Sequence, residues 1–207
     1  MRHEIIRMEH VNISRPGRHE IEELNLIICH GYGIGIAGVE NSKETLADFF
    51  DGKGMLTRGR IYLNGERWKP EGKRDFEDAG IFVISKDTVY MDSLDVSENL
   101  FLLRRNSLRK IWLNEKALHI QGRELLKKYN LPYAADEDSS HLKYGDRILI
   151  GIVRAITQGA RVLVLRGIVA CFPGEERQKL RQFVNQLKQE GITIISIDNR
   201  ADFEDPF

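Results

Sequence analysis

Ile-Gly-Ile-Ala-Gly-Val-Glu-Asn-Ser-Lys-Glu-Thr-Leu-Ala-Asp-Phe-Phe-Asp-Gly, residues 34–52, is the stretch that decides the fold of this chain. Ile34 to Ala37 is a short apolar run, which is typical of a buried strand, and Gly38 opens a tight loop. Thr45 to Phe50 is predicted to be a helix with its apolar side chains facing inward, and Gly52 ends it. A strand, a loop that begins with glycine and a helix together form the frame of a phosphate-binding loop.

The loop itself departs from the phosphate-binding pattern. A working loop has the form G-x-x-x-x-G-K-[ST], because glycines let backbone N–H groups turn towards phosphate oxygens. Here the segment from Gly38 to Lys43 lacks a second glycine and is one residue too short. Counting from Gly38 puts Glu44 in the place of the lysine, whereas counting back from the apolar face of the helix puts Lys43 there. We prefer the second register, since an apolar helix face is harder to shift than a loop length.

The start of this helix leaves two interpretations open. In the preferred register Lys43 can still reach a phosphate; the alternative is a surface lysine at a helix start. Asn41 or Ser42 can cap the helix, and Asn41-x-x-Glu44 is typical of a capping box, in which side chains satisfy the helix end that a phosphate would otherwise occupy. The candidate nucleotide-binding residues are Gly38, Asn41, Ser42, Lys43 and Thr45.

The composition fits a globular protein. The chain has 207 residues, of which 42% are hydrophobic and 30% charged, and its formal net charge is zero. This balance gives no bulk electrostatic case for nucleic acid. We find no apolar run near the roughly 18 to 20 residues of a membrane helix and no signal peptide, so we expect a cytoplasmic location. Cys29 and Cys171 have no metal-ligand spacing and are expected to be reduced, buried thiols.

The order of predicted elements favours a parallel sheet in the C-terminal half, where helix and strand alternate. The segment 104–110, with Trp112 beside it, is basic. Two interpretations stay open: it forms a solvated face of the protein, or it contacts an anionic partner. The predicted strands cover 4–11, 21–29, 34–37, 60–63, 81–84, 161–165 and 192–197. Besides the helix at 45–50, the predicted helices cover 73–78, 96–103, 115–129 and 175–190, and the segment 142–149 leads into a further helix that ends at Thr157.

The motif order resembles the nucleotide-binding domain of ATP-binding-cassette (ABC) transporters, most closely that of sugar importers of the ribose, xylose and galactose type. Asp95-Val-Ser-Glu-Asn-Leu-Phe-Leu102 is similar to the family's S-V-A-E-N-I-F-L. Leu142-x-x-Gly145 resembles the signature motif, 160–165 the Walker B strand and 79–84 the strand before the Q-loop. The resemblance covers almost the whole chain. It implies an α/β, P-loop NTPase-like ABC ATPase fold with a mixed or parallel sheet core, an N-terminal antiparallel β subdomain and a helical subdomain at about 88–145.

The departures from the family pattern fall where its chemistry resides. After the Walker B strand, the metal-positioning aspartate is replaced by Arg166 and the catalytic glutamate by Gly167. Neither an arginine nor a glycine can perform those tasks. The other replacements are Arg15 for the stacking aromatic, Lys86 for the Q-loop glutamine, Asn199 for the switch histidine, and Leu142-Lys-Tyr-Gly-Asp146 for the signature Leu-Ser-Gly-Gly-Gln.

Together these departures predict a degenerate ABC-type subunit that does not hydrolyse ATP and acts as a structural or regulatory partner. ATP binding is expected to be weak, without Mg²⁺. The expected partner is another ABC subunit, a permease or a regulatory protein, with a dimer as one arrangement, no nucleic acid, and membrane association only through a partner. Two alternatives stay open: a working ATPase subunit of a sugar importer, and a nucleotide sensor without hydrolysis.

Residues 1–207 are expected to form a single ABC ATPase-like domain. Because the chain ends at Phe207, short of the family's last elements, it is also interpreted as one half of a tandem cassette.

The lost metal site suggests a specific contact. In the family, a hydroxyl after the loop lysine and the aspartate after the Walker B strand converge on one metal; those positions here hold Glu44 and Arg166. If the two strand ends lie side by side in the parallel sheet, an ion pair between these side chains replaces the metal bridge. The alternative is two independent surface charges.

Overall fold

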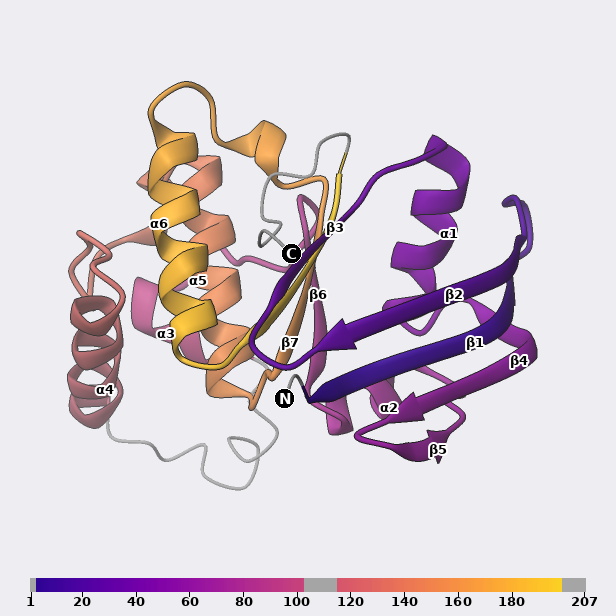
Figure 1. Ribbon diagram of the computed structural model, residues 1–207. Coiled ribbons are helices and arrows are strands. Elements are labelled where there is room, and N and C mark those ends of the chain that lie inside the picture. The colour runs from indigo at the N-terminus through magenta and orange to yellow at the C-terminus, as the bar shows by residue number, and fades with distance from the viewer. Residues whose placement is uncertain (1–2, 103–114, 199–207) are drawn as a thin grey trace. The chain divides into compact units, whose positions relative to one another are not determined.

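The computed structural model describes residues 3–102 and 115–198 of the chain (Figure 1). They form two compact units. The first unit contains residues up to Ser85 and from Ala160 onward, and it carries both sheets. The second unit, Lys86–Gly159, is helical. The expectation that the whole chain is a single domain stays a prediction.

An antiparallel sheet with the strand order β2-β1-β4-β5 begins the first unit. Strand β1 was predicted to end at Val11 but continues further, because register shifts around His10, which has a φ of 48°, let Ile13 still face the core. Such bulges bend a strand without ending it. The bounds are β1 Glu4–Ser14, β2 Ile21–Cys29, β4 Met55–Leu63 and β5 Glu66–Trp68.

A second sheet is entirely parallel, as the alternation of helix and strand predicts, and its order is β3-β8-β7-β6. Its two central strands are almost completely buried, which explains their continuous apolar sequences. The bounds are β3 Gly33–Ile36, β6 Ile81–Ser85, β7 Val162–Arg166 and β8 Thr193–Ile197.

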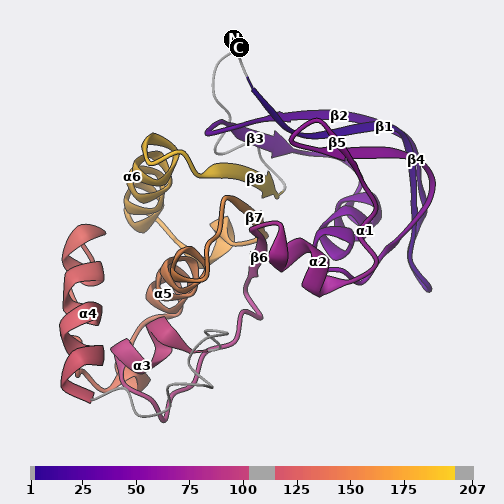
Figure 2. The same ribbon diagram turned by 90° about the horizontal axis from the view of Figure 1, so that it is seen from below.

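Helix α1, Glu40–Phe50, packs between the two sheets, and α6, Glu176–Gln189, covers the parallel sheet on its other face (Figure 2). The predicted inward side chains of α1 are confirmed: Leu46, Phe49 and Phe50 are almost fully buried. Short helices α2, Lys73–Asp78, and η3, Val169–Cys171, complete this unit.

The start of α1 differs from the prediction. The helix begins at Glu40, not Thr45, and its N-cap is Val39, which makes no side-chain capping bond. The proposed capping box of Asn41 and Glu44 is therefore wrong, because both residues lie inside the helix. Aromatic packing holds the other end: Phe49 makes edge-to-face contacts with Phe50 and Phe76 at centroid distances of 5.9 and 5.3 Å.

In the helical unit, α3 (Val96–Phe101) packs against α4 (Glu115–Lys128) and α5 (Tyr144–Thr157), and η2 covers Ser139–His141. Asp95 and Glu98 form a complete capping box at α3. Helices α3 and α4 approach closely at Gly122, where an added Cβ would lie 2.1 Å from the Ser97 Oγ. Glycine is therefore required at that point of the interface.

The aromatic cluster under α1 predicts a large loss of stability on truncation. Replacing Phe49, which is 0% exposed, with alanine should lower the free energy of unfolding by about 3–5 kcal/mol, measured by urea denaturation. The control Met55→Ala, at a side chain that is 61% exposed, should change it by less than about 0.5 kcal/mol. Equal losses in the two variants would contradict this account of the core.

Candidate functional site

The five predicted nucleotide-binding residues lie at the loop before α1 and in its first turns. Gly38 and Asn41 are exposed and Ser42 is half-buried, whereas Lys43 and Thr45 are buried. The backbone N–H groups of Ser42 and Lys43 both donate to the carbonyl of Val39, at 3.1 Å. These two amides are thus used by the helix's own first turn.

Lys43 and Thr45 have partners within the protein. The Lys43 side chain is 7% exposed, and its Nζ lies 2.8 Å from the Glu40 carboxylate. The Thr45 hydroxyl lies 2.7 Å from the carbonyl oxygen of His19 and 2.9 Å from that of Asn41. It therefore helps to connect the loop before β2 to α1. A phosphate at this loop would have to compete with these contacts.

Arg166, the last residue of β7, bears the main interaction of the site. Its Nε lies 3.3 Å from one carboxylate oxygen of Glu44 and its Nη2 donates to the other, so the fork grips that carboxylate through two hydrogen bonds. The remaining nitrogen, Nη1, donates to Asp48 at 2.9 Å. All three guanidinium nitrogens are therefore engaged, which is the arrangement that suits arginine best.

Two arginines of the β1–β2 loop extend this contact. Arg15 Nη1 forms an ion pair with the second carboxylate oxygen of Asp48. The Nη2 atom of Arg18 lies 3.7 Å from Oε2 of Glu44, and its Nε atom lies 4.0 Å from Oδ2 of Asp48. We call these five residues, Arg15, Arg18, Glu44, Asp48 and Arg166, the arginine network. It joins the β1–β2 loop, α1 and the end of β7.

The electrostatics explain why the network holds together. Asp48, with a side chain that is 2% exposed, could not stay charged in the core without cationic partners. Burial raises the pKa of the Glu44 carboxyl, but the hydrogen bond and charge of Arg166, followed by the charges of Arg18 and Lys43, outweigh it and leave that pKa below its ordinary value. Three guanidinium groups face two carboxylates, so the network carries one net positive charge.

The predicted ion pair of Glu44 and Arg166 is confirmed, but the premise for it was wrong. Strands β3 and β7 are not neighbours, because β8 lies between them in the sheet. The side chains meet instead because α1 packs against β7 as well as β6. The part of α1 that carries Glu44 therefore lies beside the end of β7. The contact therefore depends on where the helix lies and not on strand adjacency.

Asp48 and Arg18 were missed by sequence reasoning. Asp48 had a usable signal: it stands four residues after Glu44 and so lies on the same face of α1. No sequence pattern pointed to Arg18, because it lies in an irregular segment between two strands. Arg15, which replaces the family's stacking aromatic, was noted as a departure, but its pairing with Asp48 was not anticipated.

The residues present do not fit Mg²⁺ at this place. Mg²⁺ requires oxygen ligands in near-octahedral geometry, and the carboxylates available are those of Glu44 and Asp48. Both already bind the Arg166 guanidinium, and a divalent ion between them would meet that cation at short range. Elsewhere in residues 3–102 and 115–198, no group of three or more His, Cys, Asp or Glu side chains is arranged to hold a metal.

The other predicted motif positions are not members of the arginine network. Gly167, with a φ of 60°, follows Arg166 and has no side chain to act as a base. In the helical unit, Tyr144 begins α5 and its hydroxyl donates to the carbonyl of Lys86, which is itself exposed. Asp146 lies in the first turn of α5. Asn199, the basic segment 104–110 and Trp112 lie outside the described residues.

Two further expectations can be compared with the structure. Cys29 and Cys171 form no disulfide, but both are half-buried, so the prediction that they are buried was too strong. Within the described ranges, no helix is both long and apolar enough to cross a membrane.

Known proteins with similar sequences include ATP-binding proteins of ribose import. A ribose import ATP-binding protein of Clostridium perfringens (strain SM101) is 26% identical over 200 residues, which cover 96% of this chain and 40% of that protein. One from Jannaschia sp. (strain CCS1) is 25% identical over 199 residues, covering 96% of this chain and 39% of its own length. The chain thus spans about two fifths of these relatives. No family model matches the chain.

Solved structures agree on the fold. An ATP-binding cassette of an ABC transporter, MJ1267 in its ADP conformation, matches with a TM-score of 0.80 at 20% identity, covering 97% of this chain and 83% of that one. CbiO1 from Clostridium perfringens, part of an ABC transporter complex, matches with a TM-score of 0.76 at 19% identity. The match covers 93% of this chain and 77% of that one. The chain therefore has the ABC ATPase fold. Its resemblance to the nucleotide-binding domains of ABC transporters, of the sugar-importer type, is confirmed.

A double-mutant cycle on Glu44→Ala and Arg166→Ala tests the central ion pair. The two side chains are 23% and 22% exposed, so their coupling in the free energy of unfolding should exceed about 1 kcal/mol, the upper end for exposed pairs. The matched control is Arg74 with Asp78 on α2, at 3.7 Å and 82% and 49% exposed. That pair should couple by no more than about 0.5 kcal/mol. A lack of coupling between Glu44 and Arg166 would refute the interaction.

The lowered pKa of Glu44 also predicts a pH dependence. A carboxyl whose folded pKa lies below its unfolded value contributes stability that is complete above the ordinary pKa of 4.5. That stability is lost as the pH falls through the folded pKa. The difference in unfolding free energy between wild type and Glu44→Gln should therefore shrink from pH 7 towards about pH 3. A difference that stays constant over this range would contradict the prediction.

Proposed function

We propose that this chain is a degenerate ABC-type domain of a sugar importer that does not hydrolyse ATP and works as a structural or regulatory partner. The likeness to ribose import ATP-binding proteins supports the connection with sugar import. The arginine network supports the loss of hydrolysis, and it is the observation that carries the proposal.

Hydrolysis in P-loop proteins requires a metal that bridges the phosphates and a residue that orients the attacking water. At the expected metal position, the Arg166 guanidinium already neutralises Glu44 and Asp48. At the expected base position, Gly167 offers no side chain. The two requirements fail for different chemical reasons, so a single rearrangement would not restore both.

Weak nucleotide binding follows from the same region. The Lys43 amine is paired with Glu40, and the Thr45 hydroxyl is directed at backbone carbonyls. These contacts speak against the alternative of a nucleotide sensor that uses Lys43, and the arginine network speaks against a working ATPase.

The proposed partner is another ABC subunit, a permease or a regulatory protein, and a dimer of cassettes is one arrangement that suits it. In this proposal the domain works in the cytoplasm and meets the membrane only through its partner. The support is the likeness to ABC proteins, among them CbiO1, which is part of a transporter complex.

The purified chain should release phosphate from Mg-ATP only at the background rate, because the metal-binding and water-orienting groups are replaced. A malachite-green assay measures this, with Lys43→Ala as the control that should leave the rate unchanged. ATP at low millimolar concentration, with or without Mg²⁺, should shift the thermal midpoint no more than adenosine does. Phosphate release that disappears in Lys43→Ala would show a working ATPase. A shift of several degrees with ATP alone would favour the sensor.

A further inference from the structure

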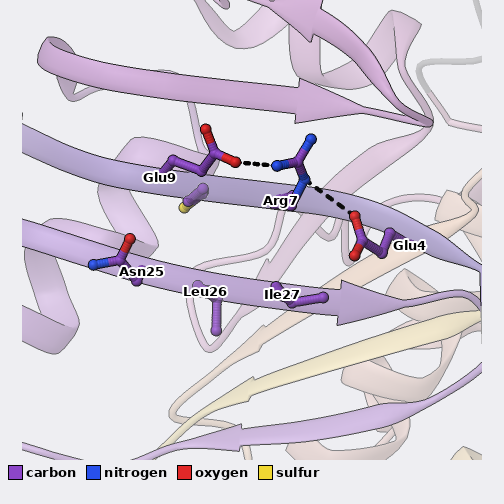
Figure 3. Close-up of a pocket in the computed structure, with 7 residues that line it drawn as sticks. Glu4, Arg7, Glu9, Asn25, Leu26 and Ile27 are labelled. Carbon is purple, nitrogen blue, oxygen red and sulfur yellow. Dashed lines mark hydrogen bonds and ion pairs between the residues drawn. The ribbon is translucent and has the colours of Figure 1, made fainter.

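The outer face of the antiparallel sheet carries charges that divide into two halves. On the β1–β2 half, Arg7 lies between two carboxylates: its Nε is 3.1 Å from Glu4, and its Nη1 pairs with Glu9. Figure 3 shows this arrangement, with Asn25, Leu26 and Ile27 of β2 lining the same open groove. The arginine on this half is thus neutralised by its own neighbours.

The β4–β5 half is different. Arg60, Arg67 and Lys69 are exposed, and in the described part of the chain none of the three has an ion-pair partner. Tyr62 stands directly opposite Arg67 in the hairpin. Strand alternation puts Arg60, Tyr62 and Arg67 on the face opposite the core, because Ile61 and Trp68 between them pack inward, and Lys69 continues the same alternation. We call Arg60, Arg67 and Lys69 the hairpin cations.

The excess of positive charge is local. Seven basic and two acidic residues lie between positions 53 and 74, in a chain whose formal net charge is zero. Several of these basic residues have acidic partners, such as Arg58 with Glu23 and Arg74 with Asp78. The hairpin cations form no such ion pair, although Glu9 of β1 stands opposite Arg60 in the register, so the uncompensated positive charge is greatest at Arg67 and Lys69.

We propose that the β4–β5 face is a docking surface for an acidic, extended segment of a partner protein. In a strand, residues i and i+2 are about 6.6 to 6.8 Å apart on one face, which is also the spacing of alternate side chains in an extended peptide. Carboxylates at alternate positions of such a segment match the spacing of Arg67 and Lys69, and Arg60 lies beside this pair on the neighbouring strand β4. Arginine can grip each carboxylate through two hydrogen bonds.

Two other anionic partners fit this face less well. Single-stranded nucleic acid needs aromatic faces for stacking, but the Arg7 guanidinium covers the Tyr62 ring at 4.2 Å from its centroid. Membrane surfaces are bound by cations together with exposed apolar side chains, and none of the large apolar side chains in residues 58–69 is exposed. The proposal goes beyond the proposed function, since it rests on a different face from the arginine network and holds whether or not ATP is hydrolysed.

Fluorescence anisotropy on the full chain tests this surface. The probe is a labelled peptide of about ten residues that alternates glutamate and serine, with a glutamine–serine peptide as the uncharged control. The glutamate peptide should bind at about 50 mM salt and weaken strongly by about 500 mM. The triple variant Arg60→Gln, Arg67→Gln, Lys69→Gln should bind about tenfold more weakly.

A matched variant removes three exposed charges elsewhere, Arg123→Gln, Lys127→Gln and Lys179→Gln, and should bind like wild type. All substituted residues are exposed, so both variants should keep the wild-type circular dichroism spectrum and thermal midpoint. The proposal is overturned if the glutamate peptide does not bind at low salt, or if the two variants bind it equally. Tighter binding of oligouridylate or of phosphatidylserine vesicles through the hairpin cations would overturn it as well.

Discussion

Helix α1 has two opposed faces, and the rest of the first unit depends on how both are satisfied. One face buries Leu46, Phe49 and Phe50 in the core between the sheets. The other presents Glu44 and Asp48, and Asp48 is almost fully buried. A buried carboxylate without partners would cost several kcal/mol, so the helix can occupy this place only because guanidinium groups reach it from two other segments. The apolar face positions the helix, and the arginine network makes that position electrostatically acceptable.

The network changes the physical character of the site that the fold usually provides. A metal ion and a nucleotide come from solution, and the extent to which they stabilise a protein depends on their concentration and affinity. Arg166 is part of the chain, so its charge is always present beside Glu44 and Asp48 and does not depend on ligand supply. A domain organised in this way keeps the frame of a nucleotide-binding domain without needing the nucleotide to hold it. This property supports the proposed role as a structural or regulatory partner.

On the antiparallel sheet, in contrast to the arginine network, part of the charge is not compensated within the protein. Arg7 is balanced by Glu4 and Glu9 within the protein, while the hairpin cations form no ion pair among the described residues. Compensated charge contributes to the fold, whereas uncompensated charge on an exposed face favours association with an anionic partner. The two halves of one sheet face thus have different consequences, although their sequences look equally charged.

The sequence by itself determined the elements and their class, because apolar periodicity and turn residues act over a few neighbours along the chain. The strands around Val162 and Thr193, the inward side of α1 and the likeness to ABC nucleotide-binding domains were all predictable in this way. The missing acids at Arg166 and Gly167 were equally visible. Only the tertiary structure decided that β8 separates β3 from β7, that Asp48 joins Glu44 on Arg166, and that Arg15 and Arg18 complete the network. The contacts of Arg166 with Glu44 and Asp48 join segments more than a hundred residues apart through the packing of one helix across a sheet, and those of Arg15 and Arg18 join a loop to that helix. No local sequence pattern encodes such contacts.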